Sequence, residues 1–133
     1  MKLFKRIGIT IMLLPFIVIA GIIIYEIVGM CVNHAATDRQ TEKLQTDLTE
    51  KISDIEIINV NSETGNASGT GNHVESMSTI MFSTGMTEGE IKAVLPEEYN
   101  FDRESCVLRR EEDGSYSIYL ETPAPFPDNI EGH

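Results

Sequence analysis

A long apolar stretch near the N-terminus constrains this chain more than any other feature. Residues 7–32 read IGITIMLLPFIVIAGIIIYEIVGMCV, and Glu26 is their only charged side chain. The uncharged part, Ile7 to Tyr25, would span about 28 Å as a helix, at about 1.5 Å per residue. The hydrocarbon core of a bilayer is about 30 Å thick, and a soluble helix normally keeps a polar stripe. Residues 7–32 are therefore predicted to be a transmembrane anchor helix.

Basic residues mark one side of this anchor. Lys2, Lys5 and Arg6 come directly before it, whereas the first basic residue after it is Arg39. Cytoplasmic segments that flank a membrane helix carry an excess of Lys and Arg. Residues 1–6 are therefore predicted to be a cytoplasmic N-terminus. The chain after the anchor is predicted to lie outside the cytoplasm, held at the cell membrane by a single pass.

A basic start followed by an apolar run also describes a cleavable signal peptide. Such peptides have apolar runs of about 7–15 residues and small residues before the cleavage point. The run here is longer, and a cut after either alanine of the pair that follows would leave Asn33 or His34 where a small residue is needed. An uncleaved signal anchor is expected, with a cleaved signal peptide as the alternative. Glu26 is then expected at the outer interface, where a carboxylate reaches water.

The chain after the anchor is strongly acidic. Residues 33–133 contain seven basic and twenty acidic residues, which gives a net charge of −13, against −11 for the whole chain. Nucleic acids and anionic lipid headgroups would both repel such a domain. No nucleic-acid partner is expected; the expected partner is another membrane or envelope protein.

Residues 33–53 are predicted to form a polar juxtamembrane or stalk helix. Its apolar residues make one narrow stripe, because Leu44, Leu48 and Ile52 follow one another at intervals of four, which places them on the same helix face. This helix is expected either to continue the anchor as a stalk or to pack one side on the domain that follows.

Residues 54–122 are predicted to form a small α+β domain outside the cytoplasm. A Thr-x-x-Glu capping box at Thr87 and Glu90 begins a short helix, and Glu112-Asp113-Gly114 indicates a hairpin turn. These elements give the order ββαββ and predict an antiparallel sheet with one helix packed on a face. The predicted strands are residues 54–62, 73–83, 106–111 and 115–122, and the predicted helix is residues 87–95.

Two further segments are expected to lack regular structure. The segment from Glu63 to Asn72 contains three glycines, which is typical of a flexible loop. Residues 123–133 read PAPFPDNIEGH. Their three prolines predict an extended, mobile C-terminal tail, in which Phe126 is the expected point of attachment.

No cluster of residues predicts catalysis, a cofactor or a metal ion. The histidines His34, His73 and His133 share no helical spacing, and His73 and Glu75 are expected on opposite faces of a strand, which makes a poor chelate. Cys31 and Cys106 could form a disulfide or remain free thiols. An enzyme would need Cys106 or His73 in a concave site beside carboxylates, so the chain is expected not to be an enzyme, with an envelope enzyme as a remote alternative.

The N-terminal residues MKLFKRIG followed by ITIML resemble the leader and first helix of type IV pilins and pseudopilins. The resemblance implies cleavage after Gly8, a long apolar-then-amphipathic helix, a β-rich head and a role as a filament subunit. It covers only these first residues, and it departs from the family at Leu13, where the family has Glu. The filament subunit is therefore the alternative to the leading interpretation, a non-enzymatic, single-pass membrane protein whose acidic domain contacts another protein.

Overall fold

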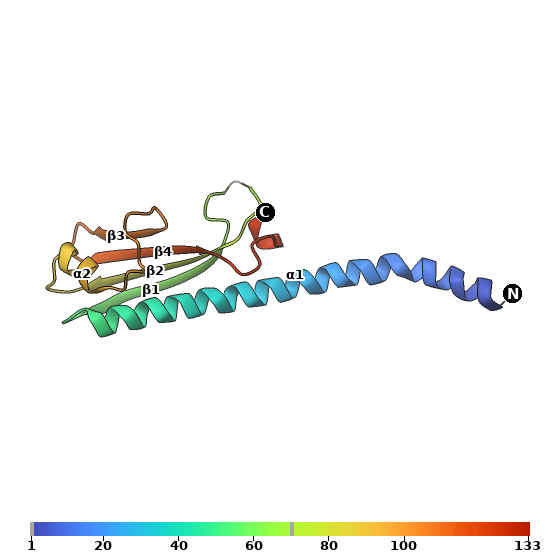
Figure 1. The fold of residues 1–133 in the computed structure, drawn as a ribbon, viewed down its shortest axis with the longest axis horizontal. Coiled ribbons are helices and arrows are strands. Elements are labelled where there is room, and N and C mark those ends of the chain that lie inside the picture. Colours follow the sequence, from blue (N-terminus) through green and yellow to red (C-terminus); the bar gives the residue numbers. More distant parts are fainter. Residues whose placement is uncertain (1, 70) are drawn as a thin grey trace.

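The chain folds into one long helix and a four-stranded antiparallel sheet. The computed structural model describes residues 2–69 and 71–133, with side chains from residue 10 onward. The predicted α+β class and the order ββαββ are confirmed (Figure 1). The elements are α1 (Lys2–Lys51), β1 (Glu56–Gly65), β2 (Glu75–Ser83), α2 (Glu88–Val94), β3 (Cys106–Arg110), β4 (Tyr116–Pro123) and the 3-10 helix η1 (Ile130–Gly132).

The predicted anchor and the predicted stalk form a single helix. No break occurs between residues 32 and 33, and the N-terminal part of α1 projects away from the sheet (Figure 1). Its side chains are open to the surroundings, as Phe16 at 66% and Ile24 at 62% exposure illustrate. Within the described part of the chain, this is the one helix long and apolar enough to cross a membrane.

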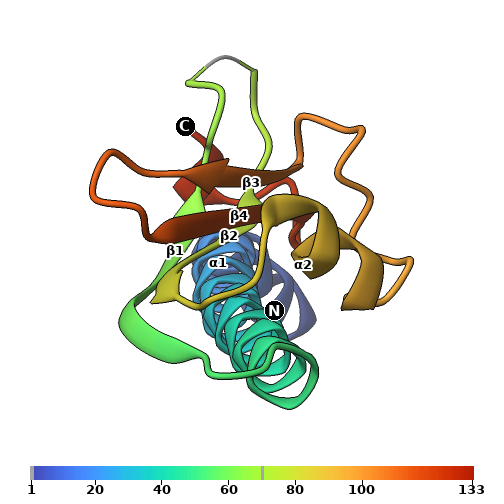
Figure 2. The ribbon, with the colours of Figure 1, turned by 90° about the vertical axis from the view of Figure 1, so that its left-hand side faces the viewer.

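Both helices pack on the same face of the sheet. The strand order is β1-β2-β4-β3, and all neighbours are antiparallel, so β2 and β4 are the central strands. Among residues 2–69 and 71–133, no helix covers the opposite face (Figure 2). The predicted stripe of α1 supplies the first three members of the buried core, which consists of Leu44, Leu48, Ile52, Ile80, Phe82, Ile91, Leu95, Tyr99, Cys106, Leu108, Tyr116 and Ile118.

Two short-range predictions are confirmed at the ends of elements. The Thr87 side chain accepts a hydrogen bond from the backbone of Glu90, and the Glu90 carboxylate accepts one from Thr87 N at 2.8 Å, so the capping box is complete. Gly114 has a φ of 88° between β3 and β4, a backbone conformation that a residue with a Cβ rarely adopts.

Asp47 of α1 ties the helix to the connection between α2 and β3. Its carboxylate accepts hydrogen bonds from Lys43 Nζ at 2.7 Å and from the Tyr99 hydroxyl. Burial by itself would raise the pKa of Asp47, but the hydrogen bonds from Lys43 and Tyr99 outweigh it, and the pKa is lowered.

This carboxylate is expected to make stability depend on pH. Because the folded pKa lies below the unfolded value, the contribution is present above about pH 4 and is lost as the pH falls through the folded pKa. Asp47→Asn is expected to lower the free energy of unfolding by about 1 kcal/mol near neutral pH, and its difference from the parent should shrink in acid. Urea unfolding of parent and variant, near neutral pH and below about pH 4, measures this difference in the free energy of unfolding. Asp102→Asn, at an exposed position, is the control, and an equal pH response in the two variants would contradict the prediction.

Candidate functional site

The stripe of α1 that faces the sheet changes character along the helix. Its C-terminal half is the apolar stripe already described, whereas its N-terminal half consists of small or polar residues at intervals of four: Gly29, Asn33, Thr37 and Thr41. All four are buried, with Asn33 at 0% and Thr37 at 1% exposure. Residues four apart share a helix face, and these short side chains let the strands and the tail approach α1 closely.

The two threonines connect α1 to the strands through hydroxyl groups. Thr37 Oγ1 lies 2.7 Å from Thr64 Oγ1 of β1 and 2.9 Å from Ser76 Oγ of β2. Thr41 Oγ1 lies 2.7 Å from Ser78 Oγ. Hydrogen bonds therefore replace apolar packing along this half of the interface, and both threonine hydroxyls have partners, as buried polar groups require.

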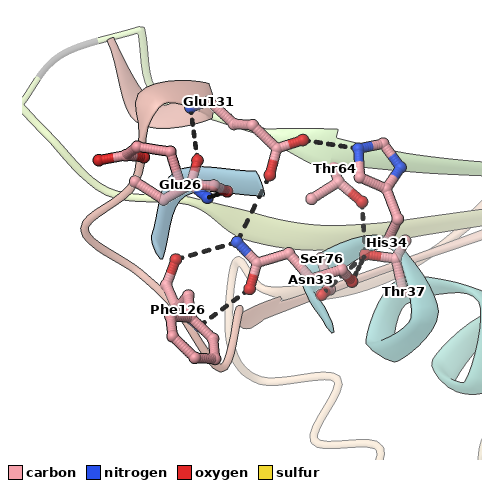
Figure 3. A network of polar contacts seen from close by, with 9 residues as sticks. Glu26, Asn33, His34, Thr37, Thr64, Ser76, Phe126 and Glu131 are labelled. Atoms are coloured by element: carbon pink, nitrogen blue, oxygen red, sulfur yellow. Dashed lines mark hydrogen bonds and ion pairs between the residues drawn. The ribbon is translucent and has the colours of Figure 1, made fainter. Parts of the chain in front are cut away.

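Asn33 binds the backbone of the C-terminal tail. Its Nδ2 donates to Phe126 O at 2.9 Å, and its Oδ1 accepts from Phe126 N at 2.9 Å, so one amide satisfies both backbone groups of Phe126 (Figure 3). His34 Nε2 lies 2.6 Å from Glu131 Oε1 in η1. The tail predicted to be mobile is thus held against α1, because buried side chains of the helix complete its backbone hydrogen bonds.

Glu26 extends the same contact toward the apolar half of α1. Its Oε2 accepts from Ile130 N at 2.9 Å, and its backbone carbonyl accepts from Asn129 Nδ2 at 3.3 Å. Phe126 also meets Tyr25 edge-on, with ring centroids 5.7 Å apart, so Phe126 is the attachment point that the sequence predicted. We call this region the helix–tail junction; it comprises Glu26, Gly29, Asn33, His34, Thr37, Thr64, Ser76, Phe126, Asn129 and Glu131.

The glycine-rich segment contacts the tail as well. The prediction of an irregular loop from Glu63 is wrong for its first residues, because β1 continues to Gly65 through pairing with β2. Beyond the strand, Asn66 Nδ2 donates to Gly132 O at 2.9 Å, and Asn72 Nδ2 donates to Asp128 Oδ1. The segment therefore serves as a second contact surface for the tail.

His73 and Glu75 lie on the same side of the chain, and the expectation of opposite faces is wrong. His73 Nε2 is 2.9 Å from Glu75 Oε1, because residues two apart in an extended segment point the same way. Ser68 Oγ lies 3.2 Å from the same nitrogen. In a Ser-His-acid relay, the serine and the acid bind different nitrogens of the histidine ring. Here Ser68 and Glu75 both approach Nε2 of His73, which is not the arrangement of such a relay. Within the described part of the chain, no three His, Cys, Asp or Glu side chains converge as metal ligands.

The remaining predicted residues do not enter the junction. Both cysteines are free: Cys31 is exposed on α1, and Cys106 is buried in the core, where burial raises the pKa of its thiol. His133 is exposed beyond η1. Lys2, Lys5 and Arg6 lie in the first turns of α1, where side chains fall outside the described part of the structure.

Searches of protein-family models, of curated proteins and of solved structures with this chain gave no match.

Gly132 shows how closely the tail and the loop approach each other. A Cβ at this position would lie 2.9 Å from His73 N and 3.0 Å from Asn72 Oδ1. Gly132→Ala is therefore expected to displace η1 from the loop at a cost of about 1–2 kcal/mol. Limited proteolysis followed by intact-mass measurement should detect faster loss of the tail. Gly85→Ala is the control, since nothing lies within 4 Å of a Cβ there, and equal cleavage of both variants would count against this account of the contact.

Proposed function

We propose that this chain is a non-catalytic, single-pass membrane protein whose acidic domain lies outside the cytoplasm and contacts another membrane or envelope protein. One observation carries the proposal: the apolar span and the domain share the continuous helix α1. The helix–tail junction joins the domain to that helix where the uncharged stretch ends. A domain attached in this way keeps a set orientation toward the bilayer, which suits a protein that presents one surface to a partner.

The face of the sheet opposite the helices is the proposed contact surface. We call it the open face; it comprises Met77, Thr79 and Met81 of β2, Val107 of β3, and Ser117 and Tyr119 of β4. These side chains are half-buried in the free chain, and methionine adapts its shape to a partner. Burial and a hydrogen bond to Glu121 raise the pKa of Tyr119, so its phenol stays neutral. Given the net charge of the domain, a partner surface without excess acidic groups is favoured.

Photo-crosslinking in the native membrane tests the partner. A photoreactive residue at Thr79, in the middle of the open face, is expected to give one discrete crosslinked product with the full-length chain. The matched control is Thr46, which is exposed on α1. The same products from both positions, or none from Thr79, would reject the open face as the contact surface.

Topology is tested with the same full-length chain. In a Cys31→Ser background, Thr46→Cys provides an exposed thiol, whereas Cys106 is only 3% exposed and serves as the unreactive internal control. An impermeant maleimide is expected to label residue 46 on intact cells. Labelling that requires cell lysis would reject export of the domain.

A second candidate, a pilin-like filament subunit, is supported by the arrangement of α1. The resemblance at the N-terminus implies a long helix whose apolar half is free and whose other half bears a β-rich head, and α1 with its antiparallel sheet has that layout. Leu13 remains a departure from the family. N-terminal sequencing of the mature protein distinguishes the candidates: a chain that begins at Ile9 supports processing after Gly8, and one that begins at Met1 or Lys2 rejects it.

A further inference from the structure

The domain meets α1 at the point where the uncharged stretch ends. Tyr25 is the last uncharged residue before Glu26, and both already contact the tail, through the ring of Phe126 and the backbone of Ile130. No spacer separates the membrane-spanning part of α1 from the domain. Tyrosine is enriched at the bilayer interface, so a span that ends at Tyr25 would place η1, whose Ile130 N donates to Glu26, at that level.

An exposed isoleucine occupies η1 at this level. Ile130 is 58% exposed, although Asn129 beside it is 2% exposed. Ile130 and apolar residues of α1 line one shallow hollow, whose members are Ile22, Ile23, Glu26, Ile27, Met30, Ile130 and His133. Ile22 and Ile23 belong to the uncharged stretch, so the apolar surface of α1 reaches Ile130 of the tail, with Glu26 and His133 at the same hollow.

We infer that η1 is a second membrane contact, with Ile130 placed among the upper acyl chains of phospholipids beside α1. The inference rests on the proposed single-pass anchoring. The occupant is lipid because lipid already surrounds the residues of α1 that form the rest of the hollow. Short apolar elements enter the interface by about 5–10 Å. The charged neighbours Glu26, Asp128 and Glu131 repel anionic headgroups, so the contact is apolar and favours zwitterionic lipid. Two attachments, α1 and η1, then oppose rotation of the whole chain about the axis of α1.

The absence of tryptophan from the chain makes this inference directly testable. The full-length variant Ile130→Trp is placed in phosphatidylcholine vesicles with and without bromine atoms on the upper acyl chains, and its fluorescence is compared with that of Ile58→Trp. Ile58 is 53% exposed on β1, so both substitutions avoid the core. Quenching at residue 130 is expected to exceed quenching at residue 58 by about threefold or more.

Three results would overturn the inference. Equal quenching at the two positions would place Ile130 in water. A shielded tryptophan whose emission changes when chains are diluted in lipid would show that a second copy covers the hollow. A chain that fails to float with the vesicles would reject the proposed anchoring as well, whereas a floating chain with a water-exposed residue 130 rejects only the second contact.

Discussion

Replacing Leu44 with alanine is expected to lower the free energy of unfolding of the domain by about 3 kcal/mol. Leu44 is 0% exposed and lies in the core between α1 and the sheet. The substitution removes buried methyl groups and leaves a cavity that rigid neighbours fill only in part. Because α1 extends as a continuous helix well beyond the core, loss of packing at Leu44 need not melt the helix, so helix content is a poor measure of this effect.

The buried thiol of Cys106 is the better measure. In a Cys31→Ser background, the full-length chain in detergent micelles is exposed to a thiol reagent over a series of urea concentrations, and labelling of Cys106 reports opening of the core. Val94→Ala is the control, because Val94 lies on α2 at 39% exposure and its truncation is expected to change the unfolding free energy little. Equal midpoints for the two variants would mean that α1 does not form a tight core with the sheet.

The second large effect is expected from Asn33→Ala in the helix–tail junction. The substitution leaves the partly buried N–H and C=O groups of Phe126 without their partner, at a combined cost of about 2–3 kcal/mol. This energy affects a local opening of the tail before it affects global unfolding. Hydrogen exchange at the Phe126 amide is therefore expected to accelerate by about 30- to 150-fold, at about 1.4 kcal/mol per factor of ten.

Two variants bracket this prediction. Asn61→Ala removes an exposed asparagine from β1 and should leave the Phe126 amide unchanged. Asn33→Asp keeps an acceptor for Phe126 N but places a carboxylate against Phe126 O and near Glu131, so it should accelerate exchange nearly as much as alanine does. Unchanged exchange in Asn33→Ala would show that Asn33 does not hold the tail.

Local patterns predicted most of the secondary structure because they act over a few residues. The capping box at Thr87, the hairpin turn at Gly114 and the core stripe that begins at Leu44 each depend on neighbours close along the chain. The sequence alone did not determine the strand order β1-β2-β4-β3, since an alternating apolar pattern shows which face of a strand is buried but not which strand lies beside it.

The helix–tail junction was missed for a related reason. Asn33, Thr37 and Thr41 lie at intervals of four, and one step of three residues leads from Thr41 to the apolar stripe that begins at Leu44. This repeat is the signal that would have extended the stripe toward the N-terminus of α1. A hydropathy pattern does not reveal this repeat, because polar residues on a helix normally face water. They are buried here because they bind groups far along the chain: Phe126 is 93 positions from Asn33, and Thr64 is 27 positions from Thr37.

The sequence by itself determined the apolar span and the elements that follow it, because helix, turn and strand signals are local and hydrophobic length is set by the bilayer. The tertiary structure alone decided how the span and the domain are joined. The proline-rich tail returns to α1 because Asn33 completes the backbone hydrogen bonds of Phe126, and the glycine-rich segment packs on that tail through Asn66. Such partners are chosen by the folded arrangement as a whole, since an unpaired buried polar group is costly wherever it lies in the chain.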